Sequence, residues 1–261
     1  MSSRTTLPRA ADGRNLVATT LLCVSSVLAP LAVHSQALSG DGYLFHRPTG
    51  SLSIRGGWSQ PNANSDIFSH ARRNLTLDRT DFGSANVIAD VGVRVSNRFS
   101  VQFSGGYSGR TADSEMRDFV DNKDQPIAQS TKLIRAPFLA GLRFDLTNPG
   151  RSIGRLAYIP SRFTPYVSAG AGAMYYKFRQ SGSFKDDNSF DIFDDVLETS
   201  GTAFASYGAL GADLTLTPVI ALTTEARYDA ARPRTSDGAF STFRKTDMSG
   251  VSATIGITFR Y

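Results

Sequence analysis

The chain has 261 residues, of which 41% are hydrophobic, 23 are glycines and one is a cysteine. This length allows one large domain or two small ones. The 28 basic and 23 acidic residues give a formal charge of +5, which is too small and too dispersed to indicate nucleic-acid binding. Beyond the N-terminus no apolar run approaches the ~20 residues of a membrane-spanning helix, so composition excludes a helical membrane protein.

Residues 1–37 have the features of a secretory signal peptide. A basic beginning is followed by an apolar segment, and small residues allow cleavage after Ala37. A retained anchor is disfavoured by Pro30 inside the apolar segment. Cys23 also lies there, so the mature protein is expected to have no disulfide and no cysteine-based metal site. Residues 38–50 are predicted to be a short periplasmic lead-in.

Eight segments of the remaining sequence alternate between apolar and polar residues with the period of two that is typical of β-strands. In the first segment, Trp58 suits the aromatic belt of a membrane interface. Residues 86–95 and 99–107 flank a tight turn at Ser96-Asn97-Arg98 and therefore predict a hairpin. The eight predicted strands are residues 51–59, 86–95, 99–107, 132–145, 165–178, 202–216, 219–229 and 251–261.

Two predicted strands have features that disturb the simple pattern. The fourth contains Pro137, which has no backbone N–H to donate, so we expect a bulge there. In the fifth, Val167 and alternate residues after it are candidates for the lipid-facing side, but Tyr166, Met174 and Tyr176 compete for it. The register of this glycine-rich strand stays open.

The connections between the predicted strands alternate in length. Tight turns join two pairs of strands, residues 146–164 form a connection of intermediate length, and the other connections are long and polar. This alternation predicts an up-and-down meander with long loops outside the cell and short turns in the periplasm. The predicted long loops are residues 60–85, 108–131, 179–200 and 230–247.

The last strand, Val251 to Tyr261, alternates strictly and ends on an aromatic residue. Together with the signal segment, the hairpin and the run Leu222 to Tyr228, it resembles the small eight-stranded bacterial outer-membrane β-barrels, the group of the OmpA transmembrane domain, OmpX and OmpW. The resemblance covers residues 51–261.

This resemblance implies an all-β fold, an eight-stranded antiparallel up-and-down transmembrane β-barrel in the bacterial outer membrane. It implies contact with outer-membrane lipid and lipopolysaccharide. We expect a monomer and, from the mild charge, no nucleic-acid partner. The resemblance also implies that the barrel-assembly machinery recognises Ile257, Phe259 and Tyr261 during biogenesis.

Charged residues lie on the faces of the strands that would point into such a barrel. Eight strands leave an interior that side chains just fill, and unpaired ions there are costly, so these charges are expected to pair. The pairs could form an ionic plug, which we favour, or line a narrow polar pore. The predicted interior charges are Arg55, Asp90, Arg94, Arg135, Arg143, Asp145, Asp213, Glu225, Arg227 and Arg260.

Evidence for catalysis is weak, and we expect no enzymatic activity and no cofactor. Hydrolytic outer-membrane barrels use a histidine near the outer rim. Here His70 is the one histidine in a predicted outer loop, with Ser69, Asp66 and Asp78 near it in sequence, but adjacency in a loop fixes no geometry.

The acidic segment 179–200 partly matches the spacing of a calcium-binding loop. It has Ile192 where the motif needs glycine for a sharp turn, so we expect no metal site. The residues at the matching positions are Asp187, Ser189, Asp191, Asp195 and Glu198.

The sequence thus predicts an integral outer-membrane barrel with a structural or surface-interaction role. One alternative is a narrow transport barrel for small hydrophobic or ionic solutes. The other is a soluble periplasmic lipocalin-like binder, which would turn its apolar faces inward around a ligand.

Overall fold

The computed structural model describes residues 42–120, 124–154, 157–185, 192–233 and 246–261. The predicted signal peptide therefore lies outside the described residues. Within them, no helix is both long and apolar enough to span a membrane. The elements are β1 (Gly50–Pro61), α2 (Asp66–Asn74), the 3-10 helix η1 (Arg79–Phe82), β2 (Ser84–Arg94), β3 (Phe99–Val120), β4 (Pro126–Asp145), β5 (Gly150–Ile153), β6 (Ala157–Pro160), β7 (Phe163–Lys185), β8 (Ile192–Thr217), β9 (Ile220–Ala231) and β10 (Gly250–Arg260).

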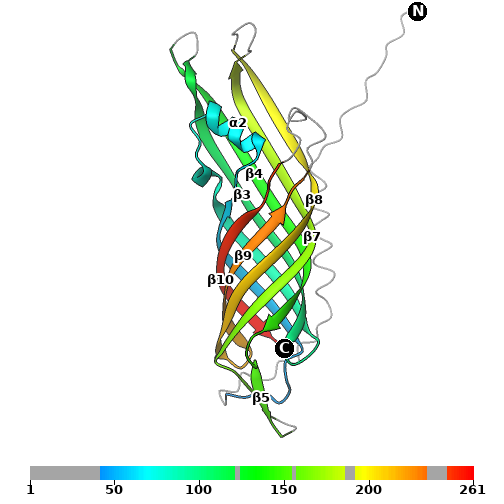
Figure 1. Cartoon of the computed structure of the whole chain (residues 1–261). Helices are drawn as coiled ribbons and strands as arrows, with labels where there is room; N and C mark the ends of the chain where they lie inside the picture. The colour runs from blue at the N-terminus through cyan, green and yellow to red at the C-terminus, as the bar shows by residue number, and fades with distance from the viewer. Residues whose placement is uncertain (1–41, 121–123, 155–156, 186–191, 234–245) are drawn as a thin grey trace, which may run out of the picture. The chain divides into compact units, whose positions relative to one another are not determined.

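Eight strands form a closed antiparallel barrel in the order β1-β10-β9-β8-β7-β4-β3-β2 (Figure 1). The first and last strands close the ring in a continuous register from Ser51 opposite Arg260 to Pro61 opposite Gly250. Every strand has a partner on both sides, so the backbone groups in the wall are paired, as a lipid environment requires. The predicted eight-stranded up-and-down barrel is confirmed.

The apolar side chains of the alternating strands point outward. Phe204 is 74% exposed and Leu210 is 65% exposed, whereas Asp213 on the same strand is 3% exposed. This arrangement is the reverse of a lipocalin-like binder, which would bury its apolar faces around a ligand. The apolar wall instead suits a lipid-facing belt.

Four strands extend well beyond their predicted ends. β3 and β4 continue to Val120 and from Pro126, and β7 and β8 continue to Lys185 and from Ile192. Much of the predicted loops 108–131 and 179–200 is therefore strand, and the loop prediction was wrong there. In Figure 1 these strands rise past β9 and β10 as one connected sheet. The extension lacks an apolar lipid-facing side, so the alternation that identifies membrane strands fades.

The predicted bulge at Pro137 is absent. The pairing of β3 with β4 keeps one register on both sides of this residue, and β4 pairs with β7 without interruption. No ladder pair joins Pro137 to Gly106 opposite it on β3. A Cβ atom on Gly106 would lie 3.1 Å from the proline ring, so a glycine there leaves space for the ring.

The structure also resolves the ambiguous register of β7. Tyr166, Met174 and Tyr176 are each less than 5% exposed and point inward. Val167 and Ala169, which alternate with Tyr166, are less buried and lie on the outer face. The larger side chains therefore fill the interior, and small residues occupy much of the outer face.

The connection 146–164 contains a small hairpin, β5 and β6, at the end of the barrel where the short turns and the C-terminus lie (Figure 1). The lead-in segment pairs with it, since Leu44 and Tyr158 exchange two backbone hydrogen bonds of 2.8 and 2.7 Å. Burial raises the pKa of the Tyr158 phenol. The predicted lead-in is thus partly ordered against the periplasmic end.

Candidate functional site

The interior of the barrel is the candidate functional site, and it has a polar periplasmic half and an apolar outer half. Ion pairs occupy the polar half. The apolar half is covered by α2, which lies in the predicted loop 60–85. We describe the two halves in turn, starting at the periplasmic end.

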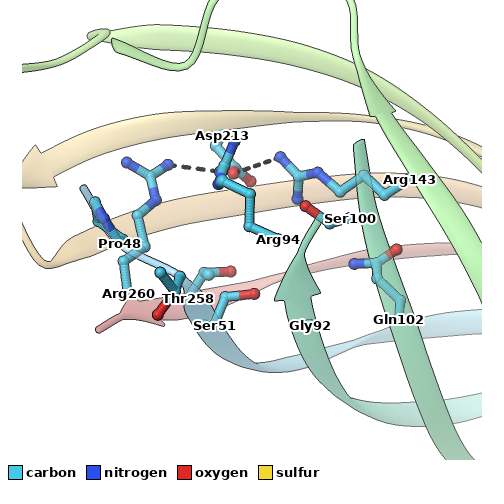
Figure 2. A pocket seen from close by; sticks show the side chains of 12 residues that line it. Pro48, Ser51, Gly92, Arg94, Ser100, Gln102, Arg143, Asp213, Thr258 and Arg260 are labelled. Carbon is cyan, nitrogen blue, oxygen red and sulfur yellow. Dashed lines mark hydrogen bonds and ion pairs between the residues drawn. The ribbon is translucent and has the colours of Figure 1, made fainter. Parts of the chain in front are cut away.

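Five charged side chains form a continuous chain of ion pairs at the periplasmic end. Figure 2 shows Asp213 of this chain between Arg143 and Arg260. Asp213 accepts hydrogen bonds from Arg143 Nη2 at 2.7 Å and from Arg260 Nη2 at 3.2 Å. Asp145 accepts from Arg143 Nε at 2.9 Å and lies 3.4 Å from Arg94 Nη1. Three arginines therefore share two carboxylates, and Arg143 joins the two halves of the chain.

A cavity of about 30 Å³ lies beside this chain. At 10–15 Å³ per water, it has room for about two water molecules. Its lining is polar, as Figure 2 shows, and includes Ser51, Ser100, Gln102 and Thr258 besides the arginines. The cavity is far smaller than a water-filled channel through the barrel.

A second cluster lies further along the interior. Arg55 is 3% exposed and forms ion pairs with Asp90 and with Glu225, the latter at 2.7 Å. Tyr166 donates a 2.9 Å hydrogen bond to Glu225, and the Arg143 guanidinium lies 3.6 Å from the centre of the Tyr166 ring. Tyr166 thus connects the two clusters through a hydrogen bond and a cation–π contact.

A third pair is formed by Arg227 and Asp229, 2.9 Å apart. Arg227 also donates to Ser104 at 2.9 Å, and its guanidinium lies 4.0 Å from the centre of the Tyr207 ring. These contacts surround the cation on three sides and hold it against the wall.

Arg135 differs from the other interior charges. It is 4% exposed and donates to Ser59 Oγ at 2.6 Å and to the Met248 carbonyl at 3.1 Å. Among the described residues no carboxylate lies within ion-pair distance of it. Arg135 lies where the polar interior meets the apolar outer half, because Met248 belongs to the apolar core.

Glycines on the inner face make room for the two large tyrosines. A Cβ on Gly211 would lie 2.4 Å from the Tyr166 ring, and one on Gly170 would lie 2.6 Å from the Tyr207 ring. A side chain at Gly211 would push the Tyr166 ring out of its place, and one at Gly170 would also meet the Ala140 carbonyl oxygen of the neighbouring strand at 2.3 Å. The glycine-rich sequence of these strands therefore serves the packing of the interior.

The outer half of the interior is filled by an apolar core around α2. Ile67 and Phe68 of this helix are 2% and 0% exposed. The Phe68 ring packs edge-on against Phe82 of η1 and against Phe178 of β7, with centroid distances of 5.0 and 5.6 Å. The helix therefore joins the predicted outer loop to the barrel wall and covers the mouth.

Arg117 on β3 holds the end of this helix. Its Nε donates to the carbonyl of Leu75 at 2.7 Å and to that of Arg72 at 3.3 Å. A cation at the C-terminus of a helix also interacts favourably with the helix dipole. A backbone hydrogen bond of 2.9 Å from Thr76 to Glu115 adds a second contact between the helix end and β3.

The structure places all ten predicted interior charges inside the wall. It joins nine of them in ion pairs and leaves Arg135 in hydrogen bonds to neutral groups. Sequence reasoning left Asp229 out of the network, although Asp229 alternates with Arg227. It also missed the apolar helix, although Ile67, Phe68 and Ala71 have helical spacing.

The three residues of the predicted assembly signal lie on the outer face of β10 or just beyond it. Phe259 and Tyr261 are 45% and 41% exposed, and Ile257 pairs with Ile54 and Leu222. The carbonyl of Tyr261 accepts hydrogen bonds of 2.8 Å from the backbone N–H groups of residues 49 and 50. Their recognition by the assembly machinery stays a prediction.

The candidate catalytic histidine and the described part of the calcium-like segment lie outside the barrel interior described above. His70 lies on the exposed side of α2 with its ring 2.9 Å from the Asn74 amide. Asp187, Ser189 and Asp191 of the calcium-like spacing lie outside the described residues, and Asp195 and Glu198 lie on β8. In the described part of the chain, no group of three or more histidine, cysteine or acidic side chains is arranged to hold a metal.

Solved structures similar to this chain include small outer-membrane barrels. Neisserial surface protein A has 12% identity and a TM-score of 0.39, with 84% of this chain and 97% of that chain covered. OprG of Pseudomonas aeruginosa has 15% identity and a TM-score of 0.45, with 84% and 99% covered. Ail of Yersinia pestis has 15% identity and a TM-score of 0.36, with 82% and 99% covered.

A search of curated protein sequences found no significant match. The family model for the outer membrane protein β-barrel domain matches residues 21–260, nearly the whole chain. This match agrees with the closed ring of strands and its outward apolar belt. The chain belongs to the outer membrane protein β-barrel domain family and is a bacterial outer-membrane barrel.

Proposed function

We propose that this protein is a closed barrel that does not conduct solutes, and that it serves the outer membrane as a structural element and presents an extended sheet at the cell surface. The proposal rests on the observation that two layers of side chains fill the interior. Ion pairs fill the periplasmic half, and the apolar core around α2 fills the outer half. A solute that crosses the barrel would have to displace both layers.

The energetics of the two layers support closure. Opening the periplasmic half separates Arg143 from two carboxylates at 2.7 and 2.9 Å, and breaking one buried pair costs about 3–5 kcal/mol. Removing α2 exposes Ile67 and Phe68, at about 1.5–3 kcal/mol for each side chain. The sum far exceeds thermal energy, so the open state would be rare.

The surface role is supported by the four long strands. β7 and β8 have 23 and 26 residues, whereas about 9–11 residues suffice to span the membrane. The excess continues as a hydrogen-bonded sheet of β3, β4, β7 and β8. A rigid sheet offers a partner a fixed surface without the ordering cost of a flexible loop.

Conductance in planar bilayers tests the proposal. The folded protein, identified by a gel mobility that shifts on boiling, should give no discrete current steps, while a general porin in the same bilayer does. Phe68→Ala weakens the outer layer, and Arg143→Ala weakens the inner layer but leaves each carboxylate one arginine. Each single variant should stay closed, because the other layer remains.

The double variant Phe68→Ala/Arg143→Ala should conduct. Current steps from the unaltered protein would refute closure and support the transport alternative. A double variant that folds, as judged by its gel shift, yet stays closed would show that these two layers are not what blocks the barrel.

A further inference from the structure

A basic cluster lies on the outer wall just above the apolar belt. On β4 the outward residues from Phe144 to Ile134 are all apolar. These ten residue steps, at about 3.3 Å each and a tilt of about 40°, rise about 25 Å, the height of the apolar band of such barrels. The next outward residue on β4 is Lys132, which is exposed.

The neighbouring strand repeats this arrangement. On β7, Tyr175 is the last aromatic residue of the outer face and is 39% exposed. The next outward residues are Lys177 and Arg179. Register places Arg179 directly opposite Lys132, and Lys177 opposite Ile134. Three cations therefore meet on two adjacent strands at the upper edge of the belt.

The cluster is not neutralised by the protein. Glu198 on β8 lies 2.7 Å from Lys177 Nζ and 4.0 Å from Arg179 Nε. In the described part of the chain no carboxylate lies within ion-pair distance of Lys132, and Arg179 Nε has no hydrogen-bond acceptor. Like charges directly opposite on neighbouring strands destabilise a sheet. Two positive charges thus remain in excess, in a position that an anion would stabilise.

We propose that Lys132, Lys177 and Arg179 bind the phosphate groups of a phosphorylated glycolipid of the outer leaflet, lipopolysaccharide. Headgroup phosphates lie at the upper edge of the belt, and guanidinium and ammonium groups bind phosphate through charge-assisted hydrogen bonds. The exposed apolar side chains below the cluster, Phe138 and Phe204, face the acyl chains of the same lipid. A free phosphate ion would gain nothing from that apolar surface.

The binding takes place on the outer wall, so it does not depend on whether the interior is closed. The test measures binding of purified bisphosphorylated lipid A to the folded barrel in detergent, without divalent cations. Lys132→Gln/Arg179→Gln removes two charges from the cluster. The control Arg151→Gln/Arg162→Gln removes two exposed charges near the periplasmic end. Glu198→Gln removes the competing carboxylate.

A basic side chain at a membrane surface contributes about fivefold to binding, so we expect the cluster variant to bind about 30-fold more weakly. The control should be unchanged, and Glu198→Gln should bind more tightly. Dephosphorylated lipid A should bind the unaltered protein as weakly as lipid A binds the cluster variant.

Equal weakening by the control pair would overturn the proposal, as would undiminished binding of dephosphorylated lipid A. Displacement of lipid A by excess inorganic phosphate would overturn it in favour of a free-anion site. Each variant is assayed only after its boiling-dependent gel shift shows a folded barrel. If the cluster variant fails to fold, the response of Glu198→Gln decides the question, because that change adds no unpaired charge inside the wall.

Discussion

Replacing Asp213 with asparagine should destabilise the barrel because Arg260 loses its carboxylate partner. Asp213 has 4% side-chain exposure and accepts hydrogen bonds from Arg143, Arg260 and the Thr223 hydroxyl, the last at 2.8 Å. After the change Arg143 keeps Asp145 as its partner. Among the described residues, Arg260 then keeps a 3.0 Å hydrogen bond to Thr215 and no carboxylate partner.

The expected cost follows from that uncompensated charge. Removing one partner of a buried ion pair costs about 3–5 kcal/mol. The Arg260 side chain is 10% exposed and lines the cavity, where water can enter, so we expect about 3 kcal/mol, the lower end. This corresponds to roughly a 100-fold change in the folding equilibrium constant.

Urea unfolding in lipid vesicles measures this cost, with the fluorescence of Trp58, the one tryptophan of the chain, as the probe. The double variant Asp213→Asn/Arg260→Gln also removes the Arg260 charge that has lost its partner. It should recover at least half of the lost free energy of unfolding. Asp195→Asn, an exposed change on the same strand, should stay within about 0.5 kcal/mol of the unaltered protein. An Asp213→Asn variant as stable as that control, or a double variant less stable than Asp213→Asn, would refute the reasoning.

Three further predictions concern other parts of the molecule. Tyr261→Asp should lower the amount of folded barrel in the outer membrane, and unchanged levels in membrane fractions would contradict the assembly signal. Gly211→Ala should cost about 1–3 kcal/mol by displacing Tyr166, whereas Gly208→Ala, whose Cβ meets nothing within 4 Å, should be neutral in the same urea assay. Arg117→Gln should speed amide exchange in α2 and leave the barrel strands protected, because the hydrogen bonds from Arg117 to the end of the helix are lost; unchanged exchange in α2 would show that Arg117 does not hold the helix.

The sequence predicts the membrane-spanning part of this fold well because lipid enforces a strict pattern. Every strand there has an apolar outer face, so period-two alternation locates the strands, and charges on the opposite face must point inward. Arg55 and Glu225 could be identified in this way before their 2.7 Å contact was known. The pattern does not give their pairing, because partners on different strands depend on the registers around the ring.

Above the membrane the outer face of the sheet no longer meets lipid and carries mostly polar residues, so the period-two alternation is lost there although residues such as Ala112 and Met116 still pack inward. The outer part of β8 therefore reads as a loop in the sequence. The nine-residue helix α2 was missed for a different reason. Its apolar residues are few, and they gain their significance only because the barrel wall provides Phe178 as a partner. The expected bulge at Pro137 follows from the missing N–H of proline alone. The sequence does not show that Gly106 lies opposite and leaves space for the proline ring.

The unequal lengths of the strands have a consequence for how the protein reaches its native state. The longest ladder, between β7 and β8, joins segments that are neighbours in the sequence, so its pairing has a low loop-closure cost. The seam between β1 and β10 is made by strands of 12 and 11 residues whose paired positions, such as Ser51 and Arg260, are 209 apart. Contacts of such high sequence separation carry a large loop-closure cost and form slowly. We therefore expect ring closure to be the late, rate-limiting event of assembly, after the tall hairpins have formed.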